Sequence, residues 1–240
     1  MPTVSLLYKK DFPITDKISI HVPTLGDVID CEDEYYNLIT LITAMPIDLM
    51  VQLDDVGIDW TTINEWELFL LLFNNLKTDP CLSLVFGKTD LSNYEPAVDE
   101  AGQVVLFDSK TGDVIDRSVY LRIASTLREI HGLERNYRKP GNAEAKRYML
   151  ERARIKQKRA ARRKKKSELE ALIVAMVNAR EFKYNFESVL GLTIYQFNAS
   201  VAQVIRRVHY DNLMFGAYMG TVNMKEINQD DLNWLAPSKK

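Results

Sequence analysis

Residues 32–56 read EDEYYNLITLITAMPIDLMVQLDDV, and this stretch decides the fold class. Its apolar residues recur every three or four positions, which is typical of amphipathic helices. The apolar positions of the first helix are Tyr35, Leu38, Ile39, Ile42 and Met45. Those of the second are Leu49, Met50, Leu53 and Val56. Pro46 suits the first turn of the second helix, and Gly57 can follow its end.

Helical signals continue on both sides of this stretch. Residues 17–22, KISIHV, alternate polar and apolar and predict a short strand. Thr24 is expected to cap a short helix over residues 25–30. Thr61 and Thr62 precede a further helix, whose apolar positions include Trp66, Phe69, Leu70 and Phe73. We therefore predict an acidic N-terminal helical module over residues 1–80.

The pattern changes over residues 81–116, where we predict a small antiparallel β element. Residues 82–86 form an apolar run that resembles a strand. Residues 104–108 and 113–116 flank a turn that ends in Gly112, which predicts a hairpin. The intervening SNYEPAVDEAG, residues 92–102, is polar and is expected to be a mobile loop.

Residues 117–240 return to helical spacing and form the third predicted module. Ser118 opens one helix and Gly132 closes it. Residues 143–179 contain no Pro or Gly, so a basic helix over 143–166 is expected to run on into an amphipathic part. A final helix starts near Thr193, before an apolar anchor in the terminal turn. The predicted fold class is α+β, mainly α, with helical modules at both ends and a small antiparallel β element between them.

Two opposite charge blocks cancel in the formal net charge of −2. The acidic block, residues 18–76, carries eleven carboxylates and no Lys or Arg. The basic run, residues 146–166, carries twelve Lys and Arg and one acid, Glu151. Asymmetry of this size concerns partners rather than fold. It predicts a protein that docks on itself, on a copy of itself or on another polyion.

The basic run admits four interpretations: a solvated spacer helix, contact with the acidic block of the same chain, contact with that of another subunit, or contact with nucleic-acid phosphates. Aromatic residues that could stack on bases are nearly absent, since Tyr148 stands alone within it. We expect contact across a subunit boundary in a head-to-tail oligomer. The residues predicted to bind partners are Arg152, Arg154, Lys156, Lys158, Arg159, Arg162, Arg163, Lys164, Lys165, Lys166, Trp234 and Leu235.

No residue pattern indicates chemistry on a substrate. A phosphate-binding loop at Gly87 would need glycine at position 82, which is Leu. Cys31 and Cys81 lack a second cysteine at motif spacing and are expected to be buried free thiols. No metal site is predicted around the scattered histidines, which are His21, His131 and His209. We therefore expect neither enzyme activity, nor a cofactor, nor a catalytic residue.

The sequence also carries no membrane or export signal. Its longest apolar run, residues 68–73, is far shorter than the roughly 20 residues of a membrane span. The first residues do not resemble a signal peptide. No membrane partner is expected, and we predict that the protein is made and used in a cytoplasm.

Three stretches together carry a family resemblance: residues 17–30, residues 59–73 and residues 195–235. The last is the most specific, with YDNLM at 210–214, then Gly216, Tyr218 and Gly220, and LNWL at 232–235. These stretches resemble tail-region assembly or baseplate proteins of tailed bacteriophages that infect Gram-positive bacteria.

The resemblance implies a non-enzymatic tail or baseplate structural or assembly protein, such as a tail assembly chaperone. Its partners would be other phage tail proteins or copies of itself. It would act in the host cytoplasm during assembly, or within the virion. The alternative function is nucleic-acid binding by the basic helix at 146–166.

Overall fold

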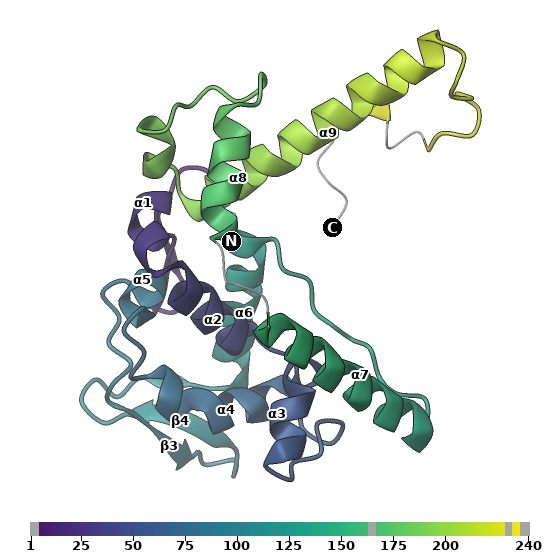
Figure 1. Ribbon diagram of the computed structural model, residues 1–240. Coiled ribbons are helices and arrows are strands. Elements are labelled where there is room, and N and C mark those ends of the chain that lie inside the picture. The colour runs from purple at the N-terminus through teal and green to yellow at the C-terminus, as the bar shows by residue number, and fades with distance from the viewer. Residues whose placement is uncertain (1–4, 163–166, 229–231, 236–240) are drawn as a thin grey trace.

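The computed structural model describes residues 5–162, 167–228 and 232–235 (Figure 1). The fold is α+β and mainly α, as predicted. The helices are α1 (Leu25–Val28), α2 (Glu32–Thr43), α3 (Met50–Asp55), α4 (Glu65–Leu76), α5 (Leu82–Phe86), α6 (Arg117–His131), α7 (Ala143–Ala161), α8 (Glu168–Val177) and α9 (Ile194–Tyr218). Single 3-10 turns occur at η1 (Ile29–Cys31), η2 (Pro46–Leu49) and η3 (Ser188–Gly191).

Two small antiparallel sheets accompany the helices. The first pairs β1 (Asp11–Pro13) with β2 (Ser19–His21). The second has the order β3-β4-β5, with β3 (Tyr94–Val98), β4 (Val104–Asp108) and β5 (Val114–Ile115). The hairpin predicted around Gly112 is the β4–β5 connection.

Capping residues explain why the ends of several helices were predicted correctly. Thr24 Oγ1 accepts a hydrogen bond from the Asp27 amide, and the Asp27 carboxylate accepts one from the Thr24 amide, so α1 starts with a capping box. Pro46 stands in the first turn of η2, and Gly57 follows α3 with φ of 76°. Gly132 ends α6 in the left-handed conformation.

Two predictions around the β element were wrong. Residues 82–86 form the helix α5 instead of a strand, because Asp79 accepts a hydrogen bond from the Cys81 amide and starts a turn just before them. A short apolar run does not distinguish the two structures. The loop expected over 92–102 contains the strand β3, and Pro96 is tolerated there because β3 is an edge strand.

The predicted continuous helix from 143 to about 179 was also wrong. α7 ends at Ala161, and α8 begins anew at Glu168. Ser167 caps α8, since its Oγ accepts from the Glu170 amide at 2.7 Å. The predicted partner-binding residues Arg163, Lys164, Lys165 and Lys166 lie outside the described residues.

One main cluster of buried apolar side chains joins all three predicted modules. It includes Ile20 and Leu38 from the first, Leu106 from the second, and Leu127 and Phe197 from the third. Helices α2, α4 and α6 pack on one another within it. Figure 1 shows α2 and α6 near the centre of the molecule and α4 below them, beside α3. The predicted boundaries at 80/81 and 116/117 remain predictions.

A second, smaller apolar cluster includes Leu53, Trp60 and Leu68 and lies next to α7.

Cys81 is buried as expected, whereas Cys31 is half-buried. Burial raises the pKa of the Cys81 thiol to about 11. Over the described ranges, no helix is both long and apolar enough to cross a bilayer.

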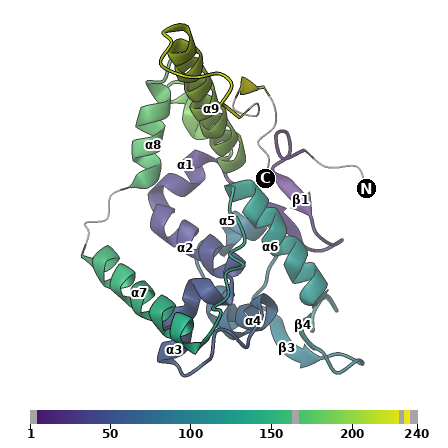
Figure 2. The ribbon, with the colours of Figure 1, turned by 90° about the vertical axis from the view of Figure 1, so that its right-hand side faces the viewer.

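α7 and most of α9 lie at the periphery of this body. α9 projects away from it in both views, and the β3–β4 hairpin lies at the opposite end of the molecule (Figures 1 and 2). α7 lies along the outside of the body next to α3. Both helices therefore expose much of their surface to solvent.

Candidate protein-docking surfaces

α7 is a surface helix formed mainly by local preferences. Asn142 Oδ1 accepts a hydrogen bond from the Ala145 amide at 2.7 Å and caps its first turn. Its sequence is rich in Ala, Lys and Arg, which favour helix. None of its residues is buried. α7 is held on the body by one of its faces.

That face meets the acidic block of the same chain. Arg154 Nη2 donates to Asp54 Oδ2 at 2.7 Å and to Asp55 Oδ1 at 2.6 Å. Lys146 Nζ lies 2.5 Å from Asp59 Oδ1. Between these contacts, the apolar side chain of Met149 packs against the smaller cluster. The basic helix is thus bound to acidic residues within one chain.

The ionisation of Asp59 reflects this contact. Hydrogen bonds from Lys146 and then from Thr61 lower the pKa of Asp59 to about 2. Arg154, one of the predicted partner-binding residues, is already engaged by Asp54 and Asp55. Lys146 and Arg154 therefore contact the acidic block within the chain, and the expected contact across a subunit boundary stays a prediction.

The other cations of α7 fall on two further faces. The first face borders a groove of about 690 Å³ between α7, η2 and the strap, residues 133–142, which joins α6 to α7. The cations that line this groove are Arg138, Arg152, Lys156 and Arg159. The second face is exposed and does not line the groove. Its cations are Arg147, Lys158 and Arg162.

α9 carries a different kind of surface. Ile194 and Phe197 in its first turn are fully buried, so its start is fixed in the core. Farther along, four apolar side chains fall on one face of the helix because of their spacing. They are Ile205, Val208, Phe215 and Met219, with exposed fractions of 63%, 43%, 68% and 65%. We call these four residues the α9 stripe.

The end of α9 is shaped by two glycines. Gly220 has φ of 70°, which suits glycine and lets the chain reverse after the helix. A Cβ atom at Gly216 would lie 2.6 Å from Val222 Cγ2, so the returning chain packs where only glycine leaves room. The Thr221 amide donates to the Gly216 carbonyl at 2.9 Å. These glycines belong to the stretch that carries the family resemblance.

The segment that follows α9, described over residues 219–228 and 232–235, is called the returning segment. It packs on α9 through Trp234. The Arg207 guanidinium lies 4.4 Å from the centre of the Trp234 ring, and Gln203 Nε2 donates to the Trp234 carbonyl at 2.9 Å. Leu235, also predicted to bind partners, is 73% exposed and does not join this packing. Trp234 thus contacts its own chain, whereas Leu235 stays accessible.

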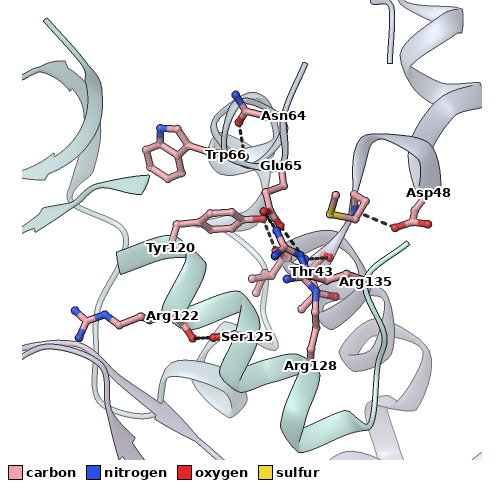
Figure 3. Close-up of polar contacts among 12 residues, drawn as sticks. Thr43, Asp48, Asn64, Glu65, Trp66, Tyr120, Arg122, Ser125, Arg128 and Arg135 are labelled. Atoms are coloured by element: carbon pink, nitrogen blue, oxygen red, sulfur yellow. Dashed lines mark hydrogen bonds and ion pairs between the residues drawn. The ribbon is translucent and has the colours of Figure 1, made fainter. Parts of the chain in front are cut away.

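A buried charged cluster joins α4, α6 and the strap, and the sequence analysis missed it (Figure 3). Glu65 in the first turn of α4 accepts from Arg128 Nη2 at 3.2 Å and also pairs with Arg135 from the strap. Arg128 Nη2 also donates to the Thr43 carbonyl at 2.6 Å. The Glu65 carboxylate therefore connects α4, α6 and the strap, and Arg128 adds the link to α2.

His131 occupies a second polar position, which is half-buried. Its Nε2 lies 2.8 Å from the Tyr35 hydroxyl and its Nδ1 lies 2.8 Å from the Leu127 carbonyl. Nδ1 therefore donates to the carbonyl, and Nε2 accepts from Tyr35. Burial lowers the pKa of His131 to about 4, so the ring is neutral at pH 7. Within the described ranges, no three His, Cys, Asp or Glu side chains gather as metal ligands would.

Comparison with known proteins finds a similarity over part of the chain. A family model described as the second domain of YomV matches residues 161–239, which include α8, α9 and the returning segment. This domain family is phage-associated, and the match is consistent with a phage protein. No curated protein and no solved structure matches the chain.

Proposed function

We propose that this protein is a non-enzymatic component of bacteriophage tail or baseplate assembly that docks its exposed helices on partner proteins. The observation that carries this proposal is the α9 stripe. Large apolar patches are uncommon on the surfaces of soluble monomers and mark interaction sites. The stripe lies within the phage-associated domain match, on a helix that projects from the body. A partner protein that covers it would remove this apolar surface from water.

The use of the buried polar groups supports a role without catalysis. The Glu65 carboxylate forms ion pairs with two arginines, and both ring nitrogens of His131 form hydrogen bonds within the protein. These residues hold helices together, as a docking protein requires.

The partners that fit the proposal are other phage tail proteins or further copies of the chain. The stretch at 195–235 that resembles tail-region proteins falls inside the matched domain at 161–239. A tail assembly chaperone would act in the host cytoplasm, whereas a baseplate component would stay in the virion. Both roles use the same exposed helix.

Nucleic-acid binding by residues 146–166 is the second candidate function. It is supported by Arg147, Lys158 and Arg162, which are exposed and have no ion pair among the described residues. Phosphate contacts would give binding that weakens steeply with salt. This function leaves the α9 stripe without a role, and we therefore favour protein docking.

The proposal is tested in a phage that encodes the protein. We expect the double substitution Ile205→Glu and Phe215→Glu to reduce the yield of tailed, infectious particles by at least about tenfold, because buried charges are costly in an apolar interface. Electron microscopy of the lysates measures the fraction of heads that carry tails. The purified variant should keep the wild-type melting temperature, since both side chains are exposed in the free protein.

The matched control is Val98→Glu, which places the same charge on an apolar residue that is 68% exposed at the opposite end of the molecule. This variant should assemble tails normally. Wild-type yields from the α9 double variant would refute the proposal. Mass spectrometry of purified virions then separates a retained component from a chaperone that leaves.

A further inference from the structure

We propose that the groove beside α7 binds an acidic amphipathic segment of a partner protein, with carboxylates on the groove cations and an apolar side chain on its floor. This inference rests on the proposed docking function and names the chemistry of one partner. The groove is separate from the α9 stripe, so the two surfaces can be tested independently.

The charge of the groove favours an acidic partner. Four cations line it, and no carboxylate does, among the described residues. Arg138, Lys156 and Arg159 have no ion pair within the described part of the chain, while Arg152 lies 5.8 Å from the centre of the Tyr148 ring. Like charges at this density repel one another, and carboxylates from a partner would relieve that repulsion.

The apolar part of the groove favours a protein segment over a nucleic-acid strand. Ile47, Met50, Met149 and Ile155 contribute aliphatic and thioether surface to it. Methionine adapts its shape to varied apolar partners. A phosphate backbone would leave this surface uncovered, whereas a leucine or methionine between carboxylates would cover it.

The contact between α7 and α3 shows how α7 recognises an acidic helix. There Asp54 and Asp55, at the end of a short amphipathic helix, meet Arg154, while Met149 packs on apolar residues beside them. The groove on the neighbouring face of α7 offers the same two features, cations and apolar surface. We infer that it selects the same kind of partner segment.

The test measures the fluorescence anisotropy of a labelled peptide built from Glu and Leu at helical spacing, with the full chain. Single exposed ion pairs are weak, so the groove must act through several cations at once. We expect saturable binding at low salt. In the triple variant Arg152→Glu, Lys156→Glu and Arg159→Glu, binding should weaken by at least about tenfold, because the three cations act together.

The matched control uses the same helix and the same change of charge. Arg147→Glu, Lys158→Glu and Arg162→Glu alter the other exposed face of α7 and should weaken binding by no more than about threefold, as expected of general electrostatics. Circular dichroism should show unchanged melting for both variants, since none of these side chains is buried.

Four results would overturn the inference. They are no saturable binding by the wild type, equal losses in the two triple variants, equal affinity for a peptide of Glu alone, or tighter groove-dependent binding of single-stranded DNA. The Ile205→Glu and Phe215→Glu variant should bind the peptide normally. If the groove does not bind the peptide but the α9 double variant still assembles few tails, the proposed function stands without this inference. If the groove binds the peptide but the α9 double variant assembles tails normally, the proposed function fails while peptide binding by the groove remains.

Discussion

Replacing Glu65 with Ala is expected to lower the free energy of unfolding by about 3–5 kcal/mol, the usual effect of breaking a buried ion pair. Glu65 is only 6% exposed and provides the carboxylate for both Arg128 and Arg135. Without it, Arg128, which is also 6% exposed, would keep a buried positive charge whose remaining described partner is the Thr43 carbonyl. The strap would also lose its attachment to α4 through Arg135.

Urea denaturation monitored by circular dichroism measures this change. Glu95→Ala is the matched control, because Glu95 pairs with Lys77 at 2.6 Å but is 67% exposed. Because the Glu95 carboxylate is exposed to solvent, this pair should contribute only about 0–1 kcal/mol, so the variant should remain close to the wild type. A Glu65→Ala protein as stable as the Glu95→Ala protein would show that the buried cluster does not hold the helices together.

A fall in pH from 7 to 4 is expected to destabilise the fold by about 3 kcal/mol through His131 alone. The unfolded chain binds a proton on this residue at about pH 6.5, whereas burial lowers the folded-state pKa to about 4. The unfolded state therefore holds more protons between these two values, and stability declines as the pH falls through that window. Below about pH 4 both states are protonated, and the effect of His131 is complete.

His131→Gln is the variant that isolates this effect. Its amide can still donate to the Leu127 carbonyl and accept from Tyr35, but it does not titrate. The free energy of unfolding of this variant should depend less on pH between about 6.5 and 4. The same slope in both proteins would show that the folded state does not lower the pKa of His131.

The parts of the fold that the sequence predicted are those set by local signals. Gly132 closes α6 and Thr193 caps α9, because a cap needs only the few residues around it. The break between α7 and α8 was also signalled locally, by Ser167 followed three residues later by Glu170. The sequence analysis did not use this signal, because residues 143–179 contain no Pro or Gly and a continuous helix was therefore predicted.

The parts that were missed depend on residues far apart in the chain. Glu65 and Arg128 are 63 positions apart, and neither sits in a motif that predicts their pairing. The charge blocks predicted that the basic helix meets carboxylates, but only the path of the strap brings Arg154 to Asp54 within one chain. The sequence analysis placed the start of a final helix near Thr193 but did not predict that Phe215 is left uncovered.

The central claim, that the α9 stripe docks on a partner protein, is tested most directly by hydroxyl-radical footprinting of Phe215 and Met219. Both side chains are about two-thirds exposed in the free protein and should react readily there. In virions or tail intermediates that contain the protein, their oxidation should fall by at least about fivefold, as expected for side chains buried in an interface. Phe107 in β4, 39% exposed and far from α9, should react equally in both samples. Equal oxidation of Phe215 and Met219 in the free and assembled protein would contradict the account.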